Sequence, residues 1–277
     1  MKSFDLEITS NRNTAIPCTI TLPEIETNMP LLLMAHGFCA TRHESGTYTM
    51  LAKKMSEAGI ATIRCDFPGC HESKESHLAN CLENNMNNLD CMLNYMKENY
   101  SIDTSKIGMI GYSMGGKVVC HYTQRHPEIR VMGLWAPACV NGMNGLNGEL
   151  GNMELLAKNL KVAQQEGVYL YENDFDERII PLSPDFLEQN INSRANDYFS
   201  AFDGDLVMVY GDLDDITPSN TLKKVAESHN PKANFLHHVI IGANHGFGAW
   251  TDQPEQMEEL VHVTASFLIS ALNKTCS

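Results

Sequence analysis

Short apolar stretches alternate with helical repeats along most of this chain, and this alternation restricts its fold more than any other feature. Stretches such as MPLLLMAHGF (29–38), KIGMIGYS (106–113) and DLVMVYGD (205–212) are nearly continuous in apolar residues, which is typical of strands buried on both faces. Between two of them, apolar residues recur at helical spacing at Leu82, Met86, Leu89, Leu93 and Met96. The pattern predicts an α/β fold: a mostly parallel, twisted sheet with helices on both faces. Two leading strands joined by the turn NRNT predict an antiparallel edge.

Residues 139–200 interrupt this alternation between two core strands. The segment opens with a stretch rich in Gly and Asn, and then offers a helix (153–163), a hairpin within 168–182 and a further helix after Pro184. Core connections usually have about 2–6 residues, so we expect an inserted cap or lid subdomain here, with 1–138 and 201–277 forming the core. A satellite subdomain packed away from the site is the alternative.

A serine at residue 113 lies between glycines in the sequence GYSMGG, directly after an apolar strand and before a helix. Gly111 and Gly115 remove side chains that would crowd a sharp strand-to-helix turn. This is the pattern of a nucleophile elbow, which lifts the serine oxygen clear of the backbone. An ordinary Gly-rich turn fits the motif alone equally well, so the remaining residues must decide.

A serine nucleophile needs a base and a carboxylate that orients the base. Asp212, Asp214 and Asp215 follow one strand, and His245 follows the last strand in a loop of small residues. The order Ser, Asp, His along the chain is that of α/β-hydrolase triads. His36 is a rival base, but it precedes a loop needed for another role, so we interpret it as structural.

The developing oxyanion of such a reaction requires backbone N–H donors. The residue after the nucleophile, Met114, supplies one of them. The loop after the third strand carries HGF, which places the N–H of Phe38 beside Gly37. Each of these features could have a purely structural role by itself. Their occurrence together, in this order along the chain, favours a serine hydrolase.

Charge and cysteine content exclude several classes of partner. A net charge of −14 over 277 residues opposes nucleic-acid binding, and no apolar run reaches the length of a membrane span. The N-terminus lacks the apolar region of a signal peptide, and nine scattered cysteines favour reduced thiols in a cytoplasmic protein. The spacing of Cys65, Cys70, His71, His77 and Cys81 fits no standard zinc site. We therefore expect neither a cofactor nor a metal.

Over nearly its full length, the chain resembles the α/β-hydrolase superfamily. HGFCATRHESGTYTMLAKKMSEAGIATIRCDFPG and GYSMGG are most similar to bacterial cinnamoyl (feruloyl) esterases. The resemblance places the pattern G-x-x-D-x-x-x-P on Gly211, Asp214 and Pro218, which selects Asp214 as the triad acid, and G-x-x-H on Gly242 and His245. It also implies that 139–200 covers the acyl pocket.

The chain departs from those relatives in two respects. The pattern D-x-x-G-x-G-x-S reads DFPGCHES here, so that His71 replaces the second glycine. The cap sequence also differs, and its aromatic residues are candidates for the pocket wall or for packing. The substrate-binding candidates are Tyr169, Tyr171, Phe175, Phe186 and Phe247.

The sequence therefore predicts a cofactor-independent serine carboxylesterase that hydrolyses small carboxylic esters, hydroxycinnamoyl (feruloyl) esters among them. Three alternatives stay open: a peptidase or amidase, an acyl-CoA thioesterase, and a non-catalytic binding protein. The expected partner is a small-molecule ester rather than nucleic acid or membrane. The oligomeric state is open, a homodimer included.

Overall fold

The computed structural model describes residues 1–173 and 177–274, and these ranges form one large and one small sheet. The large sheet has eight strands in the order β1-β2-β4-β3-β5-β6-β9-β10. Pairs from β4 to β10 are parallel, whereas β2 pairs antiparallel with both β1 and β4. The expected mostly parallel sheet with an antiparallel edge is confirmed.

The strands of the large sheet are β1 (Lys2–Thr9), β2 (Ala15–Leu22), β3 (Met29–Ala35), β4 (Ala61–Cys65), β5 (Ile102–Tyr112), β6 (Val131–Trp135), β9 (Asp205–Gly211) and β10 (Asn234–Ile240). The small sheet pairs β7 (Tyr169–Glu172) with β8 (Ile179–Leu182). The helices are α1 (Thr47–Glu57), α2 (Leu82–Asn99), α3 (Met114–Arg125), α4 (Met153–Glu166), α5 (Pro184–Ile191), α6 (Ala195–Ala201), α7 (Ser219–Glu227) and α8 (Pro254–Leu272). Short 3-10 turns are η1 (Glu44–Gly46), η2 (His77–Ala79) and η3 (Glu149–Gly151).

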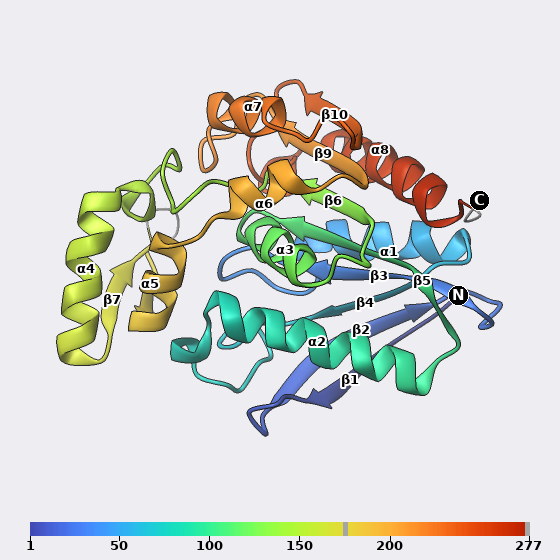
Figure 1. Cartoon of the computed structure of the whole chain (residues 1–277), viewed down its shortest axis with the longest axis horizontal. Coiled ribbons are helices and arrows are strands. Elements are labelled where there is room, and N and C mark those ends of the chain that lie inside the picture. The colour runs from blue at the N-terminus through green and yellow to red at the C-terminus, as the bar shows by residue number, and fades with distance from the viewer. Residues whose placement is uncertain (174–176, 275–277) are drawn as a thin grey trace.

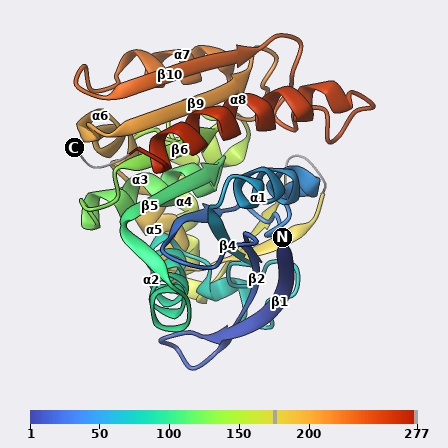
Figure 2. The same cartoon turned by 90° about the vertical axis from the view of Figure 1, so that its right-hand side faces the viewer.

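Helices cover both faces of the large sheet, with α2 and α3 on one side and α1 and α8 on the other (Figures 1 and 2). Every residue of β3, β4 and β6 is buried, as expected for parallel strands covered on both faces. None of the described helices is long and apolar enough to cross a bilayer.

The loops that follow β3, β5, β9 and β10 carry the predicted reactive groups. Phe38, Ser113, Asp214 and His245 each follow the carboxyl end of one of these parallel strands. Parallel strands end at the same edge of a sheet, and ligands of such sheets bind there. The elements α4, β7 and α5 project from this edge (Figure 1).

The inserted segment has a hydrophobic cluster of its own, built from α4, the β7–β8 hairpin and α5. Met114 belongs to this cluster and Phe38 packs against it, so the cluster continues into the loops that carry the predicted oxyanion donors. Helix α6 is different: it packs on α3, and Ala195 and Phe199 are buried in the main core. The part that packs apart from the sheet thus ends before α6, short of residue 200.

Candidate active site

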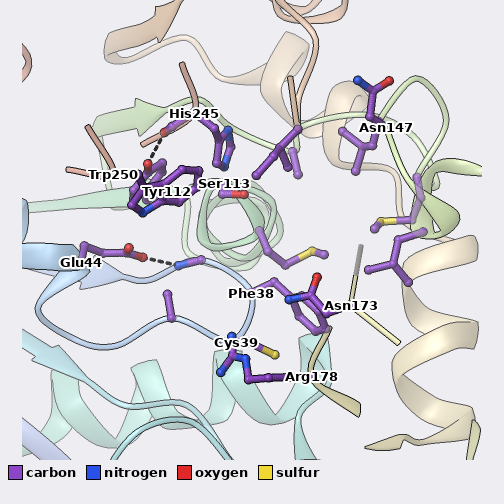
Figure 3. A pocket seen from close by; sticks show the side chains of 18 of the residues that line it. Phe38, Cys39, Glu44, Tyr112, Ser113, Asn147, Asn173, Arg178, His245 and Trp250 are labelled. Carbon is purple, nitrogen blue, oxygen red and sulfur yellow. Dashed lines mark hydrogen bonds between the residues drawn. The ribbon is translucent and has the colours of Figure 1, made fainter. Parts of the chain in front are cut away.

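A cavity of about 480 Å³ lies between the carboxyl edge of the sheet and the inserted segment (Figure 3). Ser113 and His245 line it from the core. Its apolar wall includes Met114, Met143, Leu146, Leu150 and Ile216. The volume falls in the range of about 300–1,000 Å³ that is usual for small-molecule sites.

Ser113 sits at a strained turn between β5 and α3. Its φ of 53° and ψ of −119° put a non-glycine residue in a region that L-residues rarely occupy. A Cβ on Gly111 would lie 2.4 Å from the carbonyl oxygen of Gly115, and a Cβ on Gly115 would lie 2.0 Å from that of Ala35. Both flanking positions therefore require glycine, as the sequence pattern predicts for an elbow.

His245 and Asp214 are joined by a buried hydrogen bond. His245 Nδ1 lies 2.8 Å from Asp214 Oδ2, and Asp214 Oδ1 accepts the N–H groups of Ile216 at 3.0 Å and Thr217 at 2.8 Å. A carboxylate only accepts hydrogen bonds, so Nδ1 carries the ring proton and Nε2 keeps a lone pair. Ser113 and His245 both line the cavity, and Figure 3 draws the Ser113 side chain on the side of the His245 ring. This arrangement can move a proton from the serine to the imidazole.

The rival acids and the rival base do not take part in this pair. Asp212 Oδ1 accepts the N–H of Gly242 at 2.6 Å, and Asp215 is exposed, whereas Asp214 is buried. His36 uses both ring nitrogens, since Nδ1 lies 2.8 Å from the oxygen of Gly37 and Nε2 accepts the N–H of Phe67. Burial lowers the pKa of His36 to about 4, so this histidine is neutral and structural.

The loop after β3 is held by a buried carboxyl group that sequence reasoning missed. Glu44 Oε1 accepts the N–H of Gly37 at 2.5 Å, next to the predicted oxyanion donor Phe38 (Figure 3). Burial raises the pKa of Glu44 to about 8, and the hydrogen bond from Gly37 opposes the shift. Glu44 and Ser45 have φ values of 45° and 51°, which concentrates backbone strain in this loop. No sequence signal marks Glu44, because glutamate in a polar loop is normally exposed.

Of the predicted substrate-binding residues, Tyr171 lines the cavity. Tyr169 instead donates its hydroxyl hydrogen bond to Glu149 Oε1 at 2.6 Å, away from the lining. Phe175 lies outside the described residues.

Phe186 and Phe247 are buried and do not line the cavity. Phe186 packs behind Phe38, with ring centroids 5.4 Å apart, and so supports the wall from within the insert. Phe247 packs under Tyr112 at 5.8 Å, in the loop that carries His245. The hydroxyl of Tyr112 donates to the backbone oxygen of His245, which fixes that loop (Figure 3).

A buried lysine on α3 connects this helix to the start of the inserted segment. Lys117 Nζ donates to the oxygen of Gly142 at 2.6 Å and lies 2.8 Å from Met143 Sδ. Burial lowers the pKa of Lys117 to about 7. The cavity wall at Met143 is thereby attached to the helix that begins directly after Ser113.

Among the described residues, Asp66, His71 and Glu72 form a cluster with ligand atoms close enough to hold a metal. Arg42 already occupies it, because its guanidinium bonds to Asp66 and lies 2.7 Å from Glu72 Oε2. The cluster is thus a charge network rather than a cation site. His71, which replaces a glycine of the esterase pattern, has a φ of 46°, the region that glycine favours.

A family model described as serine aminopeptidase, S33, matches residues 27–247, which include all these groups. The chain belongs to this hydrolase family. A curated Escherichia coli relative of the S33 chain is an uncharacterized 31.7 kDa protein in the traX-finO intergenic region. It is 30% identical over 114 residues, which are 40% of this chain and 38% of the relative. The match therefore spans well under half of either protein.

Several solved structures share the fold of this S33 hydrolase. Est1E from Butyrivibrio proteoclasticus, with ferulic acid bound, has a TM-score of 0.74 at 19% identity, over 97% of this chain and 100% of that one. The α/β hydrolase GrgF from Penicillium sp. sh18 has a TM-score of 0.74 at 17% identity, over 99% and 100%. A monoacylglycerol lipase from Paleococcus ferrophilus has a TM-score of 0.68 at 17% identity, over 98% and 100%. At these identities the likeness establishes the α/β-hydrolase fold.

Proposed function

We propose that this S33 hydrolase is a serine carboxylesterase that cleaves small esters with an apolar or aromatic acyl group. The observation that carries the proposal is the strained Ser113 at the cavity, beside a histidine whose Nδ1 lies 2.8 Å from Asp214. A serine hydroxyl needs such a base in order to attack a carbonyl carbon.

In the proposed mechanism, His245 Nε2 takes the proton of Ser113 as the serine oxygen attacks the ester carbonyl. The negative charge moves to the carbonyl oxygen, which the N–H groups of Phe38 and Met114 stabilise. Asp214 stabilises the imidazolium, which then protonates the leaving alcohol. Water, deprotonated by His245, attacks the acyl-enzyme and releases the acid.

The cavity wall supports the choice of an apolar acyl group. Leu146, Leu150 and Ile216 present aliphatic surface, and Tyr171 and Trp250 add aromatic surface. Both leucines and the tyrosine belong to the inserted segment, so we propose that this segment acts as a cap that selects the acyl group. Est1E, which shares the fold, is described with ferulic acid bound, and a hydroxycinnamoyl ester is the first substrate to test.

A peptidase is the second candidate, because the family description names an aminopeptidase. An aminopeptidase must bind the ammonium group of its substrate, and a carboxylate is the usual partner. Within the described lining, Glu44 is the only acidic side chain. Its carboxyl group is neutral at pH 7, because burial raises its pKa to about 8. This electrostatic environment favours the neutral ester over the charged peptide.

A matched pair of substrates distinguishes the two activities. The 4-nitrophenyl ester and the 4-nitroanilide of one acyl group are assayed together with an α-amino acid 4-nitroanilide and methyl ferulate. We expect the esters to have the higher kcat/KM, with no turnover above background by Ser113→Ala. Faster cleavage of the amino acid anilide would overturn the esterase assignment in favour of the peptidase.

A further inference from the structure

The thiol of Cys39 and the imidazole of His77 lie in contact at the edge of the cavity that Ser113 lines. Cys39 lines the cavity directly after the predicted oxyanion donor Phe38. Its Sγ lies 3.4 Å from His77 Nε2. His77 begins η2, on the loop after β4, so the pair joins two loops that are far apart in the sequence.

The hydrogen bonding of His77 fixes which ring nitrogen faces the thiol as an acceptor. Its Nδ1 lies 3.0 Å from the backbone oxygen of Pro181 in β8. A carbonyl oxygen only accepts, so Nδ1 carries the proton and donates it to Pro181. Nε2 therefore holds a lone pair toward Cys39 Sγ. Burial holds the pKa of His77 below its usual range, so the ring is neutral at pH 7 and able to take a proton.

A cation adds to this environment. Arg178 lines the same cavity as Cys39, and Figure 3 draws both side chains at the same end of it. Its positive charge adds to the lowering of the His77 pKa by burial, and it opposes the rise that burial causes in the pKa of Cys70. Thiols that are partly exposed, close to a base and to a cation are those that form a nucleophilic thiolate.

We propose that Cys39 and His77 form a second nucleophilic site in the cavity, at which soft electrophiles such as α,β-unsaturated carbonyl compounds alkylate the thiol. His77 Nε2 takes the thiol proton, and the sulfur forms a C–S bond at the β-carbon of the electrophile. The π electrons move to the carbonyl oxygen, and the resulting enolate recovers the proton from His77. The net reaction adds S–H across the double bond. The adduct fills the cavity beside Phe38 and thereby stops access to Ser113.

Other cysteines of the same chain provide the comparison. Among the described residues Cys39 and Cys91 are half-buried, and the other cysteines are buried. Cys91 lies on α2 and outside the cavity lining. It serves as an internal control for a half-exposed thiol without the His77 base.

The test treats the wild-type protein at pH 7 with a small amount of N-ethylmaleimide and follows each cysteine peptide by mass spectrometry. We expect Cys39 to be alkylated at least about tenfold faster than Cys91. Equal rates, or faster reaction at Cys91, would overturn the proposal without the use of any variant.

His77→Asn tests the base, because asparagine keeps an N–H for Pro181 while it removes the nitrogen that faces Cys39. We expect the alkylation rate of Cys39 to fall toward that of Cys91, whose rate stays the same. An unchanged Cys39 rate in a variant with wild-type circular dichroism would overturn the role of His77. The blocking step has its own readout: N-ethylmaleimide should abolish ester hydrolysis by the wild type, whereas Cys39→Ala should keep most of its own untreated activity. Equal fractional losses in both proteins would contradict that step, while the labelling result does not depend on hydrolysis.

Discussion

The buried carboxyl group of Glu44 should make stability and activity depend on pH in an unusual direction. Burial raises its pKa from 4.5 to about 8. Its charge acts on Tyr48 on α1 and Tyr112 on β5, and burial also raises the pKa values of both tyrosines. Between about pH 4.5 and 8, folded Glu44 holds a proton that the unfolded chain has lost.

The sign and size of the effect follow from this difference in bound protons. The stabilising contribution is complete below the unfolded pKa of 4.5 and is lost as pH rises through about 8. Well inside this window each pH unit lowers the free energy of unfolding by about 1.4 kcal/mol, and the slope falls to about half of that at pH 8, so the loss between pH 6 and 8 is about 2 kcal/mol. Glu44→Gln keeps an acceptor for Gly37 and cannot ionise, so it should lack this dependence.

Urea unfolding of both proteins at pH 6 and pH 8 measures the effect, since the difference between them cancels every other titrating group. The free energy of unfolding of the wild type should fall relative to that of the variant by about 2 kcal/mol. If the free energies of unfolding of the wild type and of Glu44→Gln differed by the same amount at both pH values, the assignment of a neutral Glu44 would be refuted. Above pH 8, a carboxylate beside Gly37 also opposes the oxyanion at Phe38. The kcat/KM of the wild type should therefore decline there, and that of Glu44→Gln should stay level.

Four further substitutions, one of them a control, test separate parts of the site. Asp214→Asn should lower kcat by about 10⁴-fold while Asp212→Asn stays near wild type, since Asp214 and not Asp212 bonds to the His245 ring; the reverse order of activities in parallel assays would show that the acid is assigned to the wrong residue. Tyr171→Ala should change the ratio of kcat/KM between aryl and short alkyl esters, and an unchanged ratio with lower stability would make this residue scaffolding. Gly115→Ala should lower the thermal midpoint severely, because its Cβ would meet the oxygen of Ala35 at 2.0 Å; a midpoint within a few degrees of wild type would disprove that close approach.

Local patterns were sufficient to predict the sheet and to place the candidate triad residues after its strands. The apolar runs of β3, β5 and β9 lead into HGF, GYSMGG and the aspartate cluster, and the last strand, β10, leads into the loop of His245. Because these strands are parallel, the groups that follow them lie at one edge of the sheet. Spacing could not separate Asp214 from its neighbours, and that choice came from the resemblance. In the structure Asp214 is distinguished by the N–H groups of Ile216 and Thr217, which turn its second oxygen toward His245.

The wall of the cavity could not be predicted, because it depends on which surfaces meet. An aromatic residue in the sequence indicates burial, but it does not show which surface the side chain contacts. Phe186 packs inside the insert, for example, whereas Tyr171 lines the cavity. Leu146 and Leu150 lie in a stretch rich in Gly and Asn that offered no periodic pattern. The packing of α6 on α3, with Phe199 buried in the main core, is likewise a long-range contact that no sequence interval reveals.

Hydrolysis by Ser113→Ala tests the central claim most directly. The purified variant and the wild type are assayed on the same ester, with matched circular dichroism as the control for folding and with fluorophosphonate labelling of each protein. We predict that the wild type is labelled at Ser113 and that the variant is not labelled and loses about 10⁴–10⁶-fold in kcat. A folded variant that keeps more than about a tenth of the wild-type rate would contradict the assignment of Ser113 as the nucleophile.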